Sequence, residues 1–444
     1  MRLWIKDPLA ILADGAERGV VVADGRIVEL VGAGREPKTT GARPYEAGAH
    51  VVVPGLINTH HHFYQTLTRA VPAALDRQLF PWLKALYPYW AKLTPEALDL
   101  GATVAMAELM LSGCTTTTDH HYVFPAGLED GIDIEIAAAK RLGMRVLATR
   151  GSMNLSERDG GLPPDSVVQD EDTILADSKR LVDRYHERGE AAMLQVALAP
   201  CSPFSSTTSL MRSTADLAAK LDVRMHTHLA ETEDENKFCE QLFGCRPLDY
   251  LEDCGWINDR VWLAHGVHFK AEEMPRLAKG GVSISHCACS NQVLGSGTCP
   301  VCDLEAAGVR IGLGVDGSAS NDGSNLMQEV RAAFLVQRAR YGVTKVSHKD
   351  ALRWATKGSA ACVGRPELGE IAVGKRADFA LFKLDELRFS GHGDPLAALV
   401  LCGAHRADRV MVNGRWTVED GAIPGLDLAA LMQRHQDAAR KLQG

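Results

Sequence analysis

Histidines spaced two residues apart follow an apolar run near the start of the chain. Residues 51–57 are apolar or small, and His60, His61 and His62 come soon after them. Alternate residues of a β-strand point to the same face, so His60 and His62 can converge on one metal ion while His61 points away. Taken alone, the pattern also fits histidines that cap a strand through ordinary hydrogen bonds.

Three further apolar runs end in residues of the same kinds. His226, His228 and Glu231 close one run, His265 closes the next, and Asp316 closes the last. Imidazole nitrogens and carboxylate oxygens are ligands that zinc and iron accept in proteins, and the same groups move protons in hydrolysis. Their recurrence at the ends of separate runs indicates one site assembled from distant segments.

Apolar runs alternate with helical patterns between about residues 54 and 363. The expected strands span residues 51–57, 115–119, 145–149, 194–199, 224–228, 261–264, 281–286 and 310–315. Helical stretches such as 95–112, closed by Gly113, and 209–221 lie between them, as the crossovers of a parallel sheet require. This pattern predicts an α/β fold, a (β/α)8 TIM barrel, in which the chemistry belongs at the carboxyl ends of the strands.

Both ends of the chain contain short strands with turn signals. Asp24-Gly25 separates the apolar run 19–23 from 26–31, and Asn413-Gly414 follows 410–412. Such dipeptides favour tight hairpins. Because neither end offers enough strands to close a core, we expect the two ends to form one small β-sandwich domain. The expected division is β-sandwich over 1–53, barrel over 54–363, β-sandwich again over 364–425 and a C-terminal helix over 426–444.

The overall composition excludes several classes of protein. The 444 residues carry a net charge of -8, and 46% of them are hydrophobic, as is usual for a globular protein. No basic stripe follows the chain, so nucleic acid is not an expected partner. Lys6 and Asp7 interrupt any apolar signal segment, and no run of about 18 apolar residues follows, so we expect no membrane partner and a cytoplasmic location. We also expect a small-molecule substrate and a homo-oligomer.

The eleven cysteines are scattered between Cys114 and Cys402. An odd number spread over so long a chain is unlike the disulfide framework of a small secreted protein, so we expect reduced thiols. C-x-C spacing is unusual for a zinc knuckle, and free cysteines are more often small buried hydrophobes. A knuckle nevertheless stays open as an alternative for Cys287, Cys289, Cys299 and Cys302.

The arrangement of histidines and acids resembles the amidohydrolase superfamily, which carries His-x-His after strand one, histidines after strands five and six, and an aspartate after strand eight. The likeness covers nearly the whole chain, because a β-sandwich split between the two ends is also typical of that superfamily. Members with two metal ions carry a carboxylated lysine after strand four, and residues 194–203 contain no lysine. The resemblance therefore implies one metal ion, with the ligands His60, His62, His228 and Asp316.

Within the superfamily, His228-Leu-Ala-Glu231 resembles the deaminase branch. Zinc is the expected metal because it suits imidazole and carboxylate ligands with a position open for water, although iron tolerates the same ligands. The metal would lower the pKa of its bound water. The resemblance implies that Asp316 moves the water proton to the departing ammonia, that Glu231 protonates the ring nitrogen and that His265 orients the attacking water.

The neighbouring residues narrow the expected substrate. The spacing from His60 to Gln65 resembles guanine deaminases, in which this glutamine bonds the purine, although Gln65 could instead cap the following loop. The run 60–70, the segment 80–83 and the segment 314–323 resemble 8-oxoguanine deaminases more closely, while Ala288 departs from the proline of a related segment. The resemblance implies hydrolysis of 8-oxoguanine, a purine-like amino-heterocycle, to urate and ammonia.

Four more residues are candidates for the pocket by position. Trp82 belongs to an aromatic-rich stretch that could cover a flat ring or could be ordinary helix packing. Arg150, after the third strand, could contact a carbonyl of the substrate, but surface arginines are common. Cys201 and Tyr122 also follow strands.

Two alternatives remain for the activity. Guanine, isoxanthopterin or an aminotriazine would need the same metal site, so fold and ligands do not separate these substrates. A non-catalytic scaffold would keep the barrel, but it would have no need of a full ligand set together with Glu231 and His265. Bound metal and released ammonia distinguish an enzyme from a scaffold.

Overall fold

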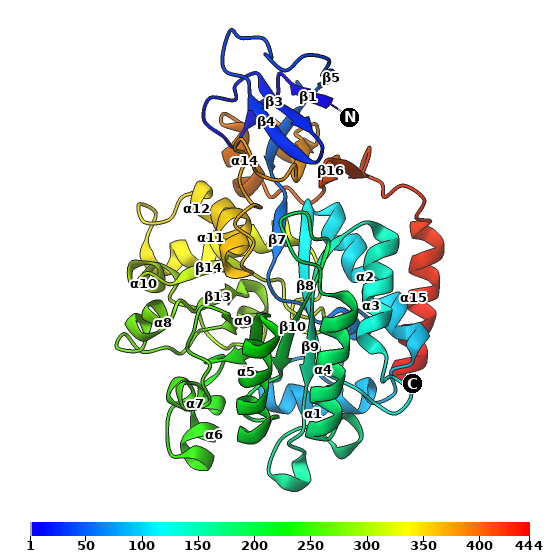
Figure 1. The fold of residues 1–444 in the computed structure, drawn as a ribbon, viewed down its shortest axis with the longest axis vertical. Coiled ribbons are helices and arrows are strands. Elements are labelled where there is room, and N and C mark those ends of the chain that lie inside the picture. Colours follow the sequence, from blue (N-terminus) through cyan, green and yellow to red (C-terminus); the bar gives the residue numbers. More distant parts are fainter. Residues whose placement is uncertain (1) are drawn as a thin grey trace.

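The computed structural model describes residues 2–444 and contains one closed barrel and two further sheets (Figure 1). The barrel strands are β7 (Leu56–Asn58), β8 (Cys114–His121), β9 (Arg145–Ser152), β10 (Leu194–Pro200), β11 (Met225–Leu229), β12 (Val261–His265), β13 (Ser283–His286) and β14 (Arg310–Leu313). Neighbouring strands pair in parallel, and β14 closes the ring onto β7. The predicted α/β barrel is confirmed.

Helices surround the barrel and connect its strands. The α-helices are α1 (Leu79–Trp90), α2 (Pro95–Leu111), α3 (Gly131–Leu142), α4 (Glu171–Tyr185), α5 (Thr208–Leu221), α6 (Glu233–Phe243), α7 (Pro247–Asp253), α8 (Met274–Gly280), α9 (Ala288–Val293), α10 (Val301–Ala306), α11 (Leu326–Tyr341), α12 (His348–Arg353), α13 (Ser359–Cys362), α14 (Pro395–Leu401) and α15 (Leu428–Gln443). The 3-10 helices are η1 (Phe63–Thr68), η2 (Glu157–Asp159), η3 (Asp165–Val167) and η5 (Leu387–Phe389), and η4 (Trp354–Gly358) is a π-helix.

Local sequence explains where the predicted helices begin and end. The Thr94 side chain accepts a hydrogen bond from the Ala97 amide at the start of α2, and Pro95 occupies its first turn. Gly113, with φ of 97°, follows the helix end. The predicted helices 95–112 and 209–221 correspond to α2 and α5 to within one residue at each end.

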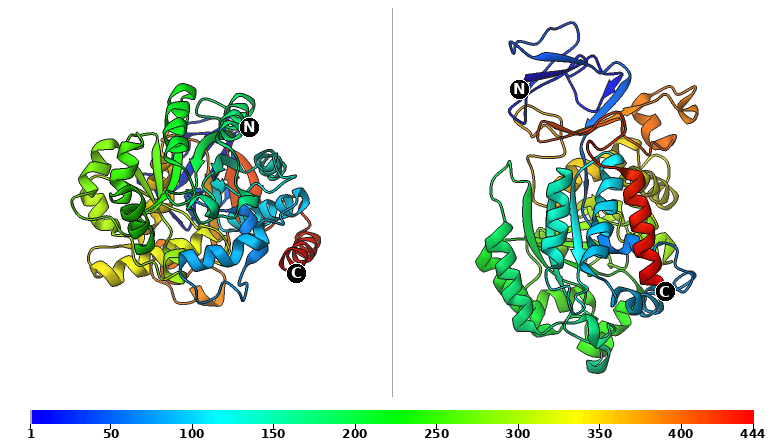
Figure 2. Two further views of the ribbon diagram at one scale, coloured as in Figure 1. Left: turned by 90° about the horizontal axis from the view of Figure 1, so that it is seen from below. Right: turned by 90° about the vertical axis from the view of Figure 1, so that its right-hand side faces the viewer.

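Two sheets lie at one end of the barrel, opposite the end where α1 lies (Figures 1 and 2). One contains β4 (Arg26–Leu30), β3 (Gly19–Ala23), β1 (Arg2–Lys6) and β5 (Arg43–Glu46), in that order. The other contains β17 (Arg415–Val418), β16 (Arg409–Val412), β15 (Phe379–Lys383), β6 (His50–Pro54) and β2 (Ala10–Ile11), in that order. The second sheet joins the two chain ends, as predicted, whereas the first is built from the N-terminal end alone. The exact boundaries between the units stay predictions.

Both predicted hairpin turns form with left-handed backbone at their two central residues. Asp24 and Gly25 have φ of 50° and 73°, and Asn413 and Gly414 have φ of 52° and 78°. Positive φ at both positions is the type I′ geometry, whose twist matches that of the flanking strands. These turns connect β3 to β4 and β16 to β17.

The predicted strand 51–57 is two strands in the structure. β6 pairs with β15 in the second sheet, and β7 enters the barrel. Gly55 separates them, and a Cβ atom there would lie 2.3 Å from side-chain atoms of Thr115. The chain can therefore pass from one sheet to the other only where a residue has no side chain.

The last helix lies along the outside of the barrel, beside α2 (red in Figure 2). Its His435 Nε2 lies 3.1 Å from Thr66 Oγ1, and Gln443 Nε2 donates to the main-chain oxygen of Leu67 at 2.8 Å. Both partners belong to η1, so α15 braces the turn that follows the histidine run. Within residues 2–444, no helix has the length and apolar character needed to cross a membrane.

Candidate active site

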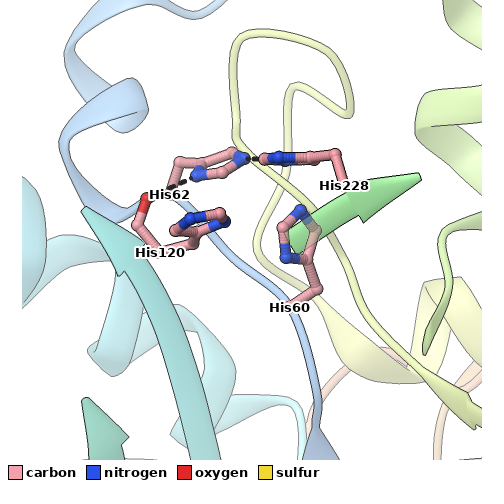
Figure 3. Close-up of side chains that lie close together, drawn as sticks. All are labelled: His60, His62, His120 and His228. Atoms are coloured by element: carbon pink, nitrogen blue, oxygen red, sulfur yellow. Dashed lines mark hydrogen bonds between the residues drawn. The ribbon is translucent and has the colours of Figure 1, made fainter. Parts of the chain in front are cut away.

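The four residues expected as metal ligands converge at the carboxyl ends of three barrel strands. His60 and His62 follow β7, His228 lies in β11, and Asp316 follows β14. Asp316 Oδ1 lies 3.2 Å from the Nε2 atoms of both His60 and His62, and His228 Nε2 lies 3.2 Å from His62 Nε2. Figure 3 shows the three imidazole rings turned toward one another. All four side chains are buried.

Hydrogen bonds fix the tautomers of His62 and His228. His62 Nδ1 donates to the main-chain oxygen of His120 at 2.7 Å, and His228 Nδ1 donates to that of Cys201 at 2.6 Å. A neutral imidazole that donates through Nδ1 carries a lone pair on Nε2. Both Nε2 atoms are therefore free to bind a cation.

A second histidine fixes the tautomer of His60. His226 Nδ1 donates to the main-chain oxygen of Trp262, and His226 Nε2 then accepts from His60 Nδ1, each at 2.8 Å. Burial lowers the pKa of His60 and His226 well below the usual range, so both rings are neutral. His60 Nε2 is buried without a hydrogen-bond partner, as expected of an atom whose partner is a metal ion.

The donor set fits one divalent metal ion. It offers three unprotonated imidazole nitrogens and one carboxylate oxygen, a combination that zinc accepts. Three of the six distances between these atoms are 3.2 Å, and a regular tetrahedron with edges of that length has its centre about 2.0 Å from each corner, the usual Zn–N distance. The sequence prediction that His61 points away also agrees with the structure, because His61 Nε2 lies 2.9 Å from Ser324 Oγ, outside this set.

His120 is a further member of the cluster that the sequence analysis did not single out. Its ring stacks on that of His228 with centroids 4.8 Å apart, and its Nε2 donates to the main-chain oxygen of Ala199 at 2.9 Å. The Nδ1 atom is buried without a partner. Its position at the end of β8, the strand beside β7, was the available signal.

The expected proton-handling residues lie beside the ligand set. His265 Nε2 is 3.5 Å from Glu231 Oε2 and 3.9 Å from Asp316 Oδ2. His265 Nδ1 donates to Asn291 Oδ1 at 3.0 Å, so Nε2 carries the lone pair. Burial raises the pKa of Glu231 well above its usual range, and the nearby charges of Asp316 and Glu235 add to the effect. These effects favour the protonated form of Glu231, the form that a proton donor needs.

Backbone strain is concentrated at these residues. His265, Asp316 and Ala230, which precedes Glu231, have φ of 73°, 64° and 54°. Left-handed backbone is costly for residues with a Cβ atom and persists where the surroundings impose it, often at functional sites. Here it turns the chain at the ends of β12 and β14, and after β11.

A small cavity of about 30 Å³ adjoins the ligand set and is lined in part by Gln65, Trp82, Tyr122 and Cys201. Gln65 Oε1 lies against Gly317, where a Cβ atom would come within 1.8 Å of it. Gln65 Nε2 is buried without a partner and is thus a free donor beside the cavity. Trp82 Nε1 donates to the main-chain oxygen of Ala319 at 3.2 Å, which fixes its ring.

Arg150 does not reach the cavity, so the prediction that it contacts substrate is wrong. Its guanidinium donates to Asp177 and to Gln169, each at 2.8 Å, and to the main-chain oxygen of Gly151. The guanidinium also lies over the ring of Phe124. The alternation of side chains along β9 turns Arg150 toward α4, the helix that carries Asp177, and away from the barrel interior.

A second buried cluster lies between the barrel and its helices, formed by Asp119, His121 and Glu135. Asp119 Oδ1 accepts from the Phe63 amide at 2.6 Å, and His121 Nδ1 lies 3.2 Å from Glu135 Oε1. Burial raises the pKa of Glu135 to about 8 and that of Asp119 well above its usual range. The two carboxyl groups therefore hold at least one proton at neutral pH. The group also has the composition of a metal site.

The cysteines give no support to the zinc knuckle. Within residues 2–444, the groups of side chains arranged to hold a metal contain no cysteine. All eleven cysteines are free, and burial raises the pKa of Cys287, Cys289 and Cys299 above the usual thiol range. Thiols held in the protonated form are poor zinc ligands.

Known proteins resemble the chain along nearly its whole length. The family model described as the amidohydrolase family matches residues 51–417. An 8-oxoguanine deaminase from Pseudomonas aeruginosa is 61% identical, covering 99% of this chain and 99% of that protein. An isoxanthopterin deaminase from an unknown prokaryotic organism is 35% identical, covering 88% of this chain and 86% of that protein.

A solved structure shares the fold as well as sequence. The crystal structure of atrazine chlorohydrolase from Arthrobacter aurescens, complexed with zinc, superposes with a TM-score of 0.92 at 33% identity, covering 98% of this chain and 100% of that chain. The family match spans well over half of the residues, and the relatives cover almost all of them. The chain therefore belongs to the amidohydrolase family.

Proposed function

We propose that the chain is a zinc-dependent hydrolase that deaminates 8-oxoguanine to urate and ammonia. One observation carries the proposal: the side chains of His62, His228, Asp316 and Glu231 and the free amide donor of Gln65 all border one cavity. Hydrolysis of an amino-heterocycle needs each of these groups. The 61% identity to an 8-oxoguanine deaminase supports the choice of substrate.

In this proposal the metal ligands are His60, His62, His228 and Asp316. Zinc suits three imidazoles and a carboxylate, and the similar atrazine chlorohydrolase was crystallised with zinc. When bound, zinc supplies a Lewis acid that activates water near neutral pH. The absence of a lysine in residues 194–203 supports one metal ion per chain.

The protein groups would move protons around the attacked carbon. Asp316 takes a proton from the attacking water, and the lone pair on His265 Nε2 orients that water. Glu231 donates its proton to the neighbouring ring nitrogen, which keeps negative charge from accumulating as the new C–O bond forms. The C–N bond then breaks, and Asp316 returns its proton to the amino group, which leaves as ammonia. The new hydroxyl group loses its proton to Glu231 as it becomes the carbonyl of urate, which restores Glu231 to its protonated form.

The side chains that line the cavity are of types that contact a flat bicyclic ring. Trp82 and Tyr122 offer aromatic surface, and Gln65 Nε2 offers a donor to an acceptor on the ring edge. We propose Gln65, Trp82 and Cys201 as substrate contacts. Homo-oligomeric assembly and a cytoplasmic location stay predictions.

The test compares kcat/KM for 8-oxoguanine, guanine and isoxanthopterin, with ammonia release as the readout and metal content measured on the same preparation. A site that pairs with the extra carbonyl of 8-oxoguanine leaves a donor unpaired with guanine, at a cost of about 1–3 kcal/mol. We expect 8-oxoguanine to be favoured by at least about tenfold. Equal or better efficiency with guanine or isoxanthopterin would reject the substrate and leave the deaminase proposal standing.

A further inference from the structure

The turn that carries Glu231 has few internal restraints. β11 ends at Leu229 and α6 begins at Glu233, so Ala230, Glu231 and Thr232 make the connection. Ala230 is left-handed, with φ of 54°. Thr232 occupies the N-cap position of α6, but its side chain makes no capping hydrogen bond. Something else must hold this strained turn in place.

Two contacts from outside the turn hold it: the His268 amide donates to the main-chain oxygen of Ala230 at 2.9 Å, and Glu235 holds the next residue. Glu235 is the third residue of α6 and is fully buried, and its Oε2 accepts a hydrogen bond from the Glu231 amide at 2.8 Å. In a capping box, the third helical residue bonds back to the amide of the N-cap residue. Glu235 instead bonds to the residue before the N-cap residue Thr232, and that residue is Glu231, the proposed proton donor.

We propose that Glu235 is a positioning residue for Glu231: its carboxyl group anchors the Ala230–Thr232 turn and thereby aims the Glu231 carboxyl at the cavity. The inference rests on the proton-donor role given to Glu231 in the proposed function. A purely structural alternative is that Glu235 only stabilises the first turn of α6, where a negative charge is favourable.

The burial of Glu235 suggests a conservative replacement. Burial raises its pKa to about 7, so a neutral side chain of the same shape is a close substitute near neutral pH. Glutamine keeps an oxygen that accepts from the Glu231 amide, whereas alanine removes the acceptor. Comparing the glutamine and alanine variants separates the effect of the hydrogen bond on activity from the effect of the negative charge.

The experiment measures kcat, KM and zinc content for Glu235→Ala and Glu235→Gln, using whichever substrate the wild-type protein turns over best. Misplacing a catalytic group by about 1 Å can cost about 10²-fold in rate. We expect Glu235→Ala to lower kcat by roughly 10-fold to 100-fold, with KM changed by less than about threefold and zinc retained. Glu235→Gln should recover most of that loss. Glu240→Ala, at an exposed position on the same helix, is the matched control.

A double-mutant cycle decides whether Glu235 acts through Glu231. In the Glu231→Gln background, the further change Glu235→Ala should cost less than about threefold in kcat, because the group being aimed is already gone. The same loss in both backgrounds, or wild-type kcat in Glu235→Ala, overturns the proposal. Loss of zinc from Glu235→Ala also overturns it. Because these comparisons are ratios between variants, they hold if the preferred substrate is not 8-oxoguanine, so the two proposals fail separately.

Discussion

His120 and His121 are neighbours in β8 and yet belong to different buried clusters. His120 faces the barrel interior and stacks on His228, whereas His121 faces outward and contacts Glu135 of α3. The two positions differ only by the alternation of side chains along a strand. In the inner cluster, the Nδ1 atoms of the three ligand histidines donate hydrogen bonds, so their Nε2 atoms are left to face the Asp316 carboxylate. Outside, two carboxyl groups hold at least one proton between them, and Asp119 accepts a hydrogen bond from the Phe63 amide.

The difference teaches that hydrogen-bond partners, more than residue types, decide what a buried histidine does. Each ligand histidine of the inner cluster donates its Nδ1 hydrogen to a fixed acceptor, either a main-chain oxygen or His226, and this bond sets the orientation of the ring. The outer cluster has carboxyl groups whose charge can be removed by protonation. We therefore interpret the inner cluster as the metal centre and the outer cluster as a support for the turn that begins at Phe63.

The largest expected effect separates the two clusters by metal content. His228→Ala removes one of four protein ligands, so we expect metal-poor protein and activity lower by several orders of magnitude. His121→Ala should keep about one metal ion per chain, since the outer group is held by protons. Elemental analysis of both purified variants checks this. A loss of metal from His121→Ala, or full metal content in His228→Ala, would reverse the assignment.

Glu231→Gln should have the next largest effect. Glutamine retains the size of the side chain but has no acidic proton, and general acid catalysis contributes roughly 10²–10⁴-fold. We expect turnover to fall by that factor while metal content stays at the wild-type level. Steady-state kinetics with elemental analysis provide the measurement. Turnover within about tenfold of wild type would show that the ring proton comes from another group.

The smallest effect concerns stability and the outer cluster. The pKa of Glu135 is about 8 in the folded protein against 4.5 as its ordinary value, so the folded state binds the extra proton. Stability from this group is present below pH 4.5 and is lost as the pH rises towards 8, by at most about 1.4 kcal/mol for each pH unit. Glu135→Gln does not titrate and should gain stability relative to wild type as pH rises.

Thermal unfolding midpoints of Glu135→Gln and the wild type, measured near pH 5.5 and pH 8 with zinc in excess, give the comparison. The unfolding midpoint of Glu135→Gln, relative to that of the wild type, should be higher near pH 8 than near pH 5.5. A difference that is independent of pH would mean that Glu135 is ionised across this range, and would point to a cation in the outer cluster.

The alternation of apolar runs with helical patterns was enough to predict the barrel, and the histidines and acids at the ends of those runs indicated one site. The particular ligand set came from the resemblance to the amidohydrolase superfamily and stays a prediction. The sequence does not reveal which side chains of β9 face the barrel interior, because that depends on the register of the strand. Arg150 lies on the outer face, where it contacts Asp177. The break at Gly55 depends on contact with Thr115, about sixty residues away. His226 and Glu235 act through hydrogen bonds to other site residues, and such partners become visible only in three dimensions.

The junction at Gly55 also bears on how the molecule opens. β6 is held by β15 from the far end of the chain, and only five residues separate Pro54 from the first expected ligand, His60. A local opening that frees β6 from its sheet would pull on the ligand set, and a bound metal ion would resist that opening. We therefore expect the sheet that contains β6 to open together with the metal centre, so that metal binding also slows fluctuations of the two chain ends.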